Sequence, residues 1–244
     1  MVNQNVVLLS YPRSGNTFTR YMLEYLTGLS SIGYLGNLSS LGAEIPLINK
    51  KITKPIIKKL HGLNDNEMKY IKNVDEDGGS LLLLLRDPLE CFIRDLGIET
   101  TSELFYSIAR GECNMFFSNL KIYDEFKSKK KIVFYEEMIN NPKQFMLKIS
   151  QFFELPKSNM INNFMKKFES HKQNSLRAYS IIGESKTQGN NKSYHLDKIL
   201  ANESNSGLGK DQLMEIIVQM VNGIDLSDEV ARTFLNAYGE VHEK

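Results

Sequence analysis

A cluster of hydrogen-bond donors lies between an apolar run and a helical pattern near the start of the chain. The apolar run, Asn5–Ser10, suits a strand that is buried on both faces of a sheet. Apolar residues then recur at helical spacing from Phe18 to Gly28, which is suited to end a helix. The junction exposes unsatisfied backbone N–H groups and the positive end of a helix dipole, and such helix starts bind phosphate. Around Gly15 the junction also carries the side-chain donors Arg13, Ser14, Asn16 and Thr17.

This junction differs from the usual ATP-binding loop. That loop requires glycine where Ser10 or Tyr11 stands, and lysine followed by serine or threonine after its last glycine. Here Asn16 and Thr17 follow Gly15, and the cation precedes the glycine. The sequence therefore predicts an anion site of another kind, and an ordinary strand–turn–helix with an exposed arginine is the alternative.

A lysine and a histidine stand two residues apart at the end of a second expected strand, 56–60. Side chains alternate between the two faces of a strand, so Lys59 and His61 are expected on the same face. Because histidine changes charge near neutral pH, His61 is a candidate general base for a hydroxyl proton. A solvated pair at a strand end is the alternative. The other histidines are expected to be structural or solvated: His171, His195 and His242.

An arginine follows the most apolar run of the chain, Ser80–Leu85. This run is the best candidate for a central parallel strand, and open α/β sheets bind ligands at the carboxyl ends of such strands. Arg86 is therefore a candidate ligand contact, and a salt bridge beside Asp87 is the alternative.

The rest of the pattern alternates strands with helices. A fourth strand is expected at 131–135, and helices are expected at 65–72, at 142–153 and within 101–127 with a break near Gly111. Such alternation predicts an α/β fold with a central parallel sheet flanked by helices. The segment 27–48 is expected to be irregular or weakly helical.

The last third of the chain is more polar. The stretch 169–205 is expected to form a mobile lid, and two helices are expected within 207–240. The lysine run Lys127–Lys131 is expected to be a solvated helix end. The two cysteines, Cys91 and Cys113, are expected to be small buried residues.

Four motifs within residues 5–155 resemble, in order, those of sulfotransferases that use 3′-phosphoadenosine 5′-phosphosulfate (PAPS). Tyr11-Pro-Arg-Ser-Gly-Asn-Thr-Phe18 is similar to the family's 5′-phosphosulfate loop, Tyr-Pro-Lys-Ser-Gly-Thr-Thr-Trp. Lys59-Leu-His61 is similar to its Lys-Thr-His catalytic strand. Leu85-Arg-Asp-Pro88 is similar to the segment with the arginine of its 3′-phosphate site. Phe134-Tyr-Glu-Glu-Met138 is similar to its Tyr-Glu-Asp-Met segment.

The resemblance implies a single domain over 1–244 with a P-loop-like nucleotide-binding architecture. It implies transfer of a sulfuryl group from PAPS, without a metal, to a hydroxyl or amine of a small molecule. His61 would be the general base, Lys59 and Arg13 would assist catalysis, and Glu44 or Asp65 are the alternative bases. The residues that would bind the cofactor are Arg13, Ser14, Gly15, Asn16, Thr17, Phe18, Arg86, Arg94 and Lys192.

Three features depart from the family's pattern. Arg13 replaces a lysine, and a guanidinium keeps the charge but cannot donate its proton at neutral pH. Arg94 stands where a serine commonly contacts the 3′-phosphate, and it either binds that phosphate or points elsewhere. The C-terminal cationic loop of the family is not recognisable, and Lys186 and Lys192 are the candidates for its charges.

The composition of the 244 residues argues against two classes of partner. A net charge of +1 gives no field that points to nucleic acid or to a membrane surface. No apolar run approaches the ~20 residues that span a bilayer, and the first residues lack the pattern of a signal peptide. Two cysteines form no disulfide framework. We therefore expect a cytoplasmic protein with a small-molecule partner.

Two other functions stay open at this point. A kinase of a small metabolite has the same strand–loop–helix architecture, but Asn16, Thr17 and Arg86 fit a Mg·ATP site poorly. A catalytically silent nucleotide-binding module is compatible with the altered 3′-phosphate motif. The segments expected to line the acceptor, 29–48 and 169–205, identify no particular acceptor, and no dimer motif indicates the oligomeric state.

Overall fold

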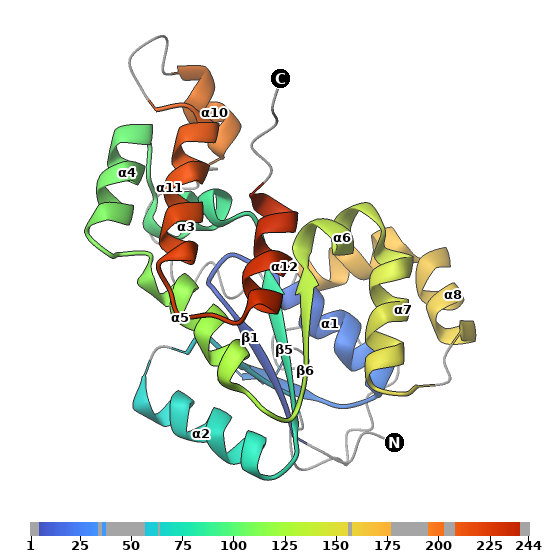
Figure 1. Cartoon of the computed structure of the whole chain (residues 1–244). Helices are drawn as coiled ribbons and strands as arrows, with labels where there is room; N and C mark the ends of the chain where they lie inside the picture. The colour runs from blue at the N-terminus through green and yellow to red at the C-terminus, as the bar shows by residue number, and fades with distance from the viewer. Residues whose placement is uncertain are drawn as a thin grey trace.

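A twisted, mostly parallel sheet forms the middle of the molecule (Figure 1). The computed structural model describes residues 5–33, 36–37, 57–62, 64–155, 158–176, 195–202 and 208–239. Within these ranges the strand order is β3-β2-β4-β1-β5-β6, and all neighbours pair parallel except β2 and β3. The strands are β1 (Val6–Ser10), β2 (Ser31–Gly33), β3 (Gly36–Asn37), β4 (Ile57–Leu60), β5 (Ser80–Leu85) and β6 (Lys129–Phe134).

The two central strands, β1 and β5, are buried along their whole length because both faces of the sheet are covered. Their alternate side chains enter two separate cores. Val7, Leu9 and Leu83 belong to the first core. Leu8 and Leu82 belong to the second. The fold is therefore a single α/β domain of three layers, as the alternation of strands and helices predicts.

Helices cover both faces of this sheet (Figure 1). The second core is closed by α1 (Asn16–Thr27), α6 (Tyr135–Asn140), α7 (Pro142–Phe152) and α8 (Ser158–Lys166). The first core is closed by α2 (Asp65–Glu76), α3 (Pro88–Leu96), α4 (Thr101–Ala109), α5 (Asn114–Glu125), α10 (Leu196–Asn202), α11 (Lys210–Asn222) and α12 (Asp228–Tyr238). In the described ranges no helix has both the length and the hydropathy to cross a bilayer.

Two sequence-based expectations about secondary structure are wrong. The segment 27–48 contains the short strands β2 and β3, and its residues 34–35 and 38–48 lie outside the described ranges. Lys129 and Lys130 belong to β6 and not to a helix end, and Lys131 lies in this strand as the expected strand 131–135 predicts. Because β6 is the outer strand of the sheet, its long side chains reach solvent, and lysines are compatible with a strand there.

The boundaries of the expected lid also need correction. Residues 168–176 are helical and pack on α1, where His171 is buried, stacks on Phe164 and lies 2.9 Å from the Tyr21 hydroxyl. Helix α10 packs on α3. Residues 169–176 and 195–202 are therefore part of the packed domain, and 177–194 and 203–207 lie outside the described residues. Cys91 and Cys113 are buried free thiols, as predicted.

Candidate active site

The loop between β1 and α1 has a backbone that only particular residues can adopt. Arg13 has φ 66° and Gly15 has φ 89°, both in the left-handed region that disfavours most side chains. A Cβ on Gly15 would lie 2.4 Å from Cδ2 of Tyr135. Glycine is thus required here for both its conformation and the close approach of the Tyr135 ring.

The N-terminus of α1 has no side-chain cap, like α5, α6, α11 and α12 and unlike four other helices. Its N-cap is Gly15, and its first turn contains no acidic residue. Side chains do cap the helices α2, α3, α4 and α7, through Asn64, Asp87, Thr100 and Asn141. The first amides of α1 are therefore available to an anion, and the helix dipole favours one there.

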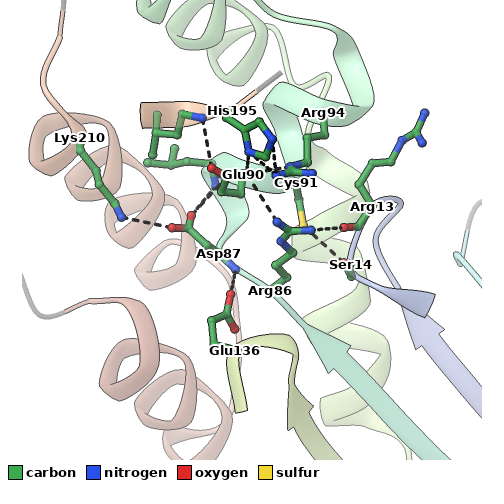
Figure 2. A network of polar contacts seen from close by, with 12 residues as sticks. Arg13, Ser14, Arg86, Asp87, Glu90, Cys91, Arg94, Glu136, His195 and Lys210 are labelled. Carbon is green, nitrogen blue, oxygen red and sulfur yellow. Dashed lines mark hydrogen bonds and ion pairs between the residues drawn. The ribbon is translucent and has the colours of Figure 1, made fainter. Parts of the chain in front are cut away.

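Three side chains of this loop are turned toward the protein. The Ser14 hydroxyl is buried and lies 3.4 Å from Sγ of Cys91 (Figure 2). Oδ1 of Asn16 accepts a hydrogen bond from the Ser10 hydroxyl. The Phe18 ring is buried edge-on against Phe168. Anion contacts by Ser14 and Phe18 would therefore come from their backbone N–H groups and not from their side chains, whereas Arg13 and Thr17 are partly exposed.

Lys59 and His61 lie beside this loop, at the carboxyl end of β4. Leu60 pairs in register with Leu9, so the next residue, His61, is level with Ser10 at the end of β1. Nδ1 of His61 lies 2.7 Å from the carbonyl oxygen of Ser10, and its Nε2 contacts Nζ of Lys59. A carbonyl only accepts, so Nδ1 carries a hydrogen and Nε2 is the nitrogen able to take a proton. The same-face placement expected from the strand period is confirmed.

Arg86 follows β5 and reaches the anion loop. Its Nη1 donates to the carbonyl oxygen of Arg13 at 3.0 Å, and its Nη2 lies 3.5 Å from Oε2 of Glu90. The guanidinium also lies over the Tyr135 ring, with Cζ 4.2 Å from the centroid. Arg86 therefore ties the ends of β1 and β5 together.

Glu90 is shared by two arginines and by the start of α10 (Figure 2). Nε of Arg94 lies 2.8 Å from Oε2, and the Leu196 amide donates to Oε1 at 3.1 Å. Burial alone would raise the pKa of Glu90, but the hydrogen bonds from Arg94 and Leu196 and the two guanidinium charges hold that pKa below its usual value. Nη2 of Arg94 contacts Nδ1 of His195. Arg94 thus points along α3 toward α10.

Further contacts brace the turn between β5 and α3. Glu136 accepts from the Asp87 amide at 2.9 Å and from the Tyr238 hydroxyl at 3.0 Å. Nζ of Lys210 lies 3.4 Å from Oδ2 of Asp87. The sequence indicated no role in the site for these bracing residues, for Glu90 or for His195. The sequence spacing does place Glu90 and Arg94 one turn apart on one face of α3, with Arg86 just before that helix.

The remaining predicted residues lie elsewhere. Lys186, Lys192 and Glu44 are outside the described residues. Asp65 is exposed at the first position of α2, at the start of a helix and not against the His61 ring. Among the residues that the structure describes, no three His, Cys, Asp or Glu side chains are grouped as a metal site requires.

Comparison with solved structures extends over almost the whole chain. The mouse sulfotransferase SULT7A1, solved in complex with 3′-phosphoadenosine 5′-phosphate (PAP), is similar over 98% of this chain and 89% of that one, with 14% identity and a TM-score of 0.57. The sulfotransferase domain of the Synechococcus PCC 7002 olefin synthase matches over 92% and 96% of the two chains, with 17% identity and a TM-score of 0.47. The sulfotransferase domain from the curacin biosynthetic pathway matches over 65% and 76%, with 15% identity and a TM-score of 0.45.

Sequence comparisons give the family. A search of curated proteins found no match. The model of the sulfotransferase domain matches residues 81–218, from β5 into α11. That match spans more than half of the chain, and the fold agrees with it, so the chain belongs to the sulfotransferase family of enzymes.

Proposed function

We propose that this enzyme transfers a sulfuryl group from PAPS to a hydroxyl or amine of a small-molecule acceptor, with His61 as the general base. The observation that carries the proposal is the position of His61 beside the uncapped start of α1. The Ser10 carbonyl fixes the ring at 2.7 Å, so a proton acceptor and an anion site share one edge of the sheet.

The residues present fit a donor with two phosphates. Arg13 and the amides of the loop and of the first turn of α1 would hold the 5′-phosphosulfate. Arg86 and Arg94 bring two guanidinium charges against the single carboxylate of Glu90, and the positive charge in excess suits a 3′-phosphate. PAPS supplies an activated sulfuryl group with a good leaving phosphate.

His61 would take the proton of the acceptor on Nε2. As that proton leaves, the acceptor oxygen or nitrogen forms a bond to sulfur, and the bond from sulfur to the bridging oxygen breaks. The products are the sulfated acceptor and PAP. Lys59, Arg13 and the amides of α1 would stabilise the negative charge that develops on the leaving phosphate.

Lys59 has a second part in this proposal. Its ammonium contacts Nε2 of His61, the nitrogen that must accept the proton. A phosphosulfate offers a charged acceptor, which forms a stronger hydrogen bond with an ammonium than a neutral imidazole does. Donor binding would therefore draw Lys59 from His61 and leave Nε2 to the acceptor.

Binding and turnover test the proposal separately. Thermal shift with PAP, AMP and ATP–Mg should give the largest stabilisation for PAP. A larger shift with ATP–Mg would favour a kinase. Single-turnover transfer from radiolabelled PAPS to a panel of alcohols, phenols and amines then tests the chemistry. PAP binding without transfer to any acceptor of the panel would favour a catalytically silent module.

A further inference from the structure

The free end of the charged cluster on α3 is formed by Arg94 and His195. Side-chain exposure is 11% for Arg86 and 18% for Glu90, but 27% for Arg94 and 38% for His195. A ligand that approaches the cluster from solvent therefore meets Arg94 and His195 first. His195 lies 101 positions beyond Arg94 in the sequence and is the residue immediately before α10 (Figure 2).

The contact between these two side chains joins a donor to an acceptor. A guanidinium nitrogen only donates, so the imidazole of His195 accepts; Nη2 of Arg94 contacts its Nδ1 and lies 3.4 Å from its Nε2. Protonation of Nδ1 would set two donors against each other. The nearest carboxylate oxygen, Oε2 of Glu90, is 3.9 Å from Nδ1 and already faces both arginines. A protonated His195 would therefore add a third cation beside one carboxylate, and a bound anion would compensate that charge.

The cluster is linked directly to the anion loop. Arg86 contacts Glu90 at one end and the carbonyl oxygen of Arg13 at the other. An anion at Arg94 and His195 would thus lie one short chain of contacts from an anion at the start of α1. One nucleotide with two phosphates would place an anion at both positions, and we favour it over two separate ions.

We propose that His195 is a direct contact of the nucleotide 3′-phosphate and takes up a proton on Nδ1 when that phosphate binds. The phosphate lies between Arg94 and His195, accepts hydrogen bonds from both, and turns their mutual contact into two charge-assisted bonds. The proton comes from solvent. This inference rests on the proposed function, because it requires a donor with a 3′-phosphate.

Several charged groups surround His195 and set the background for its titration. Arg94 and Glu90 face it from α3. Asp197 and Lys198 are exposed on α10 itself. Farther along α3, the Asp87–Lys210 pair joins α3 to α11. None of these groups is altered in His195→Gln, so that variant isolates the imidazole.

The experiment measures PAP and AMP binding by calorimetry from pH 6 to pH 8.5 in buffers of different ionisation enthalpy. Wild-type protein should take up about half a proton or more on binding PAP at pH 7.5, and its PAP affinity should rise about five- to tenfold more on acidification than that of His195→Gln. The phosphates of PAP also titrate, near pH 6, but they do so equally with both proteins. Lys198→Gln removes a cation from the same helix and should behave as wild type.

A direct measurement accompanies the variants. Imidazole NMR of the wild-type chain, with the His195 signal assigned by its loss in His195→Gln, should show protonation on addition of PAP but not of AMP. Equal proton uptake by wild type and His195→Gln would overturn the role proposed for His195, and so would an NMR signal showing that His195 stays neutral with PAP. Neither result would overturn the proposed function. A wild-type protein that binds AMP as well as PAP would overturn the 3′-phosphate site and the proposed function with it.

Discussion

Nη1 of Arg86 donates a 3.0 Å hydrogen bond to the carbonyl oxygen of Arg13. The two residues follow different strands, β1 and β5, which are neighbours in the sheet. Arg13 holds a left-handed backbone conformation, φ 66°, and this bond supports it. The arginine proposed for one phosphate thus also shapes the loop proposed for the other.

Arg86→Ala should therefore weaken binding of both PAP and AMP, and PAP about tenfold more than AMP. AMP weakens because the loop loses its support, and PAP weakens further because a charge-assisted contact to the 3′-phosphate is lost. Arg13→Ala should weaken the two ligands by similar factors. Calorimetry measures both ligands. Arg110→Ala, at an exposed pair with Glu112, is the control. AMP affinity that is unchanged by Arg86→Ala would show that the bond to Arg13 does not support the loop.

His61→Ala should lower turnover by about 10²–10⁴-fold and leave PAP affinity nearly unchanged, because a proton acceptor is lost and no phosphate contact is. The wild-type rate should fall as pH drops and His61 becomes protonated, and the variant should lose this dependence. Single-turnover rates from pH 5.5 to pH 9 test it. If His61→Ala turned over as fast as the wild-type protein, His61 would have no part in the mechanism.

Lys59→Ala should also lower turnover but keep the acid limb of the pH profile. In the pH profile of kcat/KM for PAPS, which reports the free enzyme, the limb should move to higher pH, because the positive charge beside Nε2 no longer opposes protonation of His61. Lys58→Ala is the matched control on the same strand, since Nζ of Lys58 lies 4.1 Å from the centroid of the Tyr70 ring, away from His61. An acid limb at the same pH in Lys59→Ala and wild type would argue against the contact in solution.

Gly15→Ala should destabilise the protein more than Gly78→Ala does. Both glycines have positive φ, 89° and 72°, which costs an alanine about 1–2 kcal/mol. Only at Gly15 would the new Cβ also meet the Tyr135 ring, at 2.4 Å, whereas at Gly78 nothing lies within 4 Å. Urea unfolding gives the difference in the free energy of unfolding. Equal losses in the free energy of unfolding would mean that the Tyr135 ring moves away from the new Cβ without an energetic cost.

Asp75→Ala should lower the free energy of unfolding by about 1–2 kcal/mol at neutral pH, because its carboxylate accepts hydrogen bonds from the loop amides of Lys127 and Ser128. Burial would raise the pKa of Asp75, but these hydrogen bonds outweigh it and hold the pKa below its usual value. A lowered pKa stabilises the folded state above the unfolded-state pKa, near 4, and the gain is lost as pH falls through the folded-state pKa. The difference from wild type should therefore shrink below pH 4. Asp77→Ala, exposed at the end of α2, should show no such trend.

The elements that position the site were predictable where one local rule decides the outcome. Uninterrupted apolar runs predict β1 and β5, and the period of two predicts that Lys59 and His61 share a face. Strand β2 escaped prediction because polar contacts hold it. Its Ser31 is buried against Arg20 and Glu24, with Nε of Arg20 2.9 Å from Oγ and the Ser31 amide 2.8 Å from Oε1 of Glu24.

The contacts between residues of the site could not be predicted from the sequence, for a different reason. Arg94 meets His195 only because α10 packs on α3, and no local pattern encodes a contact across 101 positions. Ser14 was expected to present its hydroxyl to a phosphate. The left-handed backbone at Arg13 instead turns that hydroxyl onto Cys91, which composition and spacing do not reveal.

The lysines of β6 also affect how copies of this chain can meet. An outer strand presents unpaired N–H and C=O groups to which a strand of another molecule can add. Nζ of Lys129 lies 5.3 Å from the centroid of the Phe152 ring on α7 and 2.7 Å from Oε1 of Glu154, and Nζ of Lys130 lies 5.1 Å from the centroid of the Tyr123 ring on α5. Charged side chains therefore flank β6 on both sides. A strand added at this edge would have to strip water from these charged groups. Aggregation by sheet extension is therefore disfavoured at this edge.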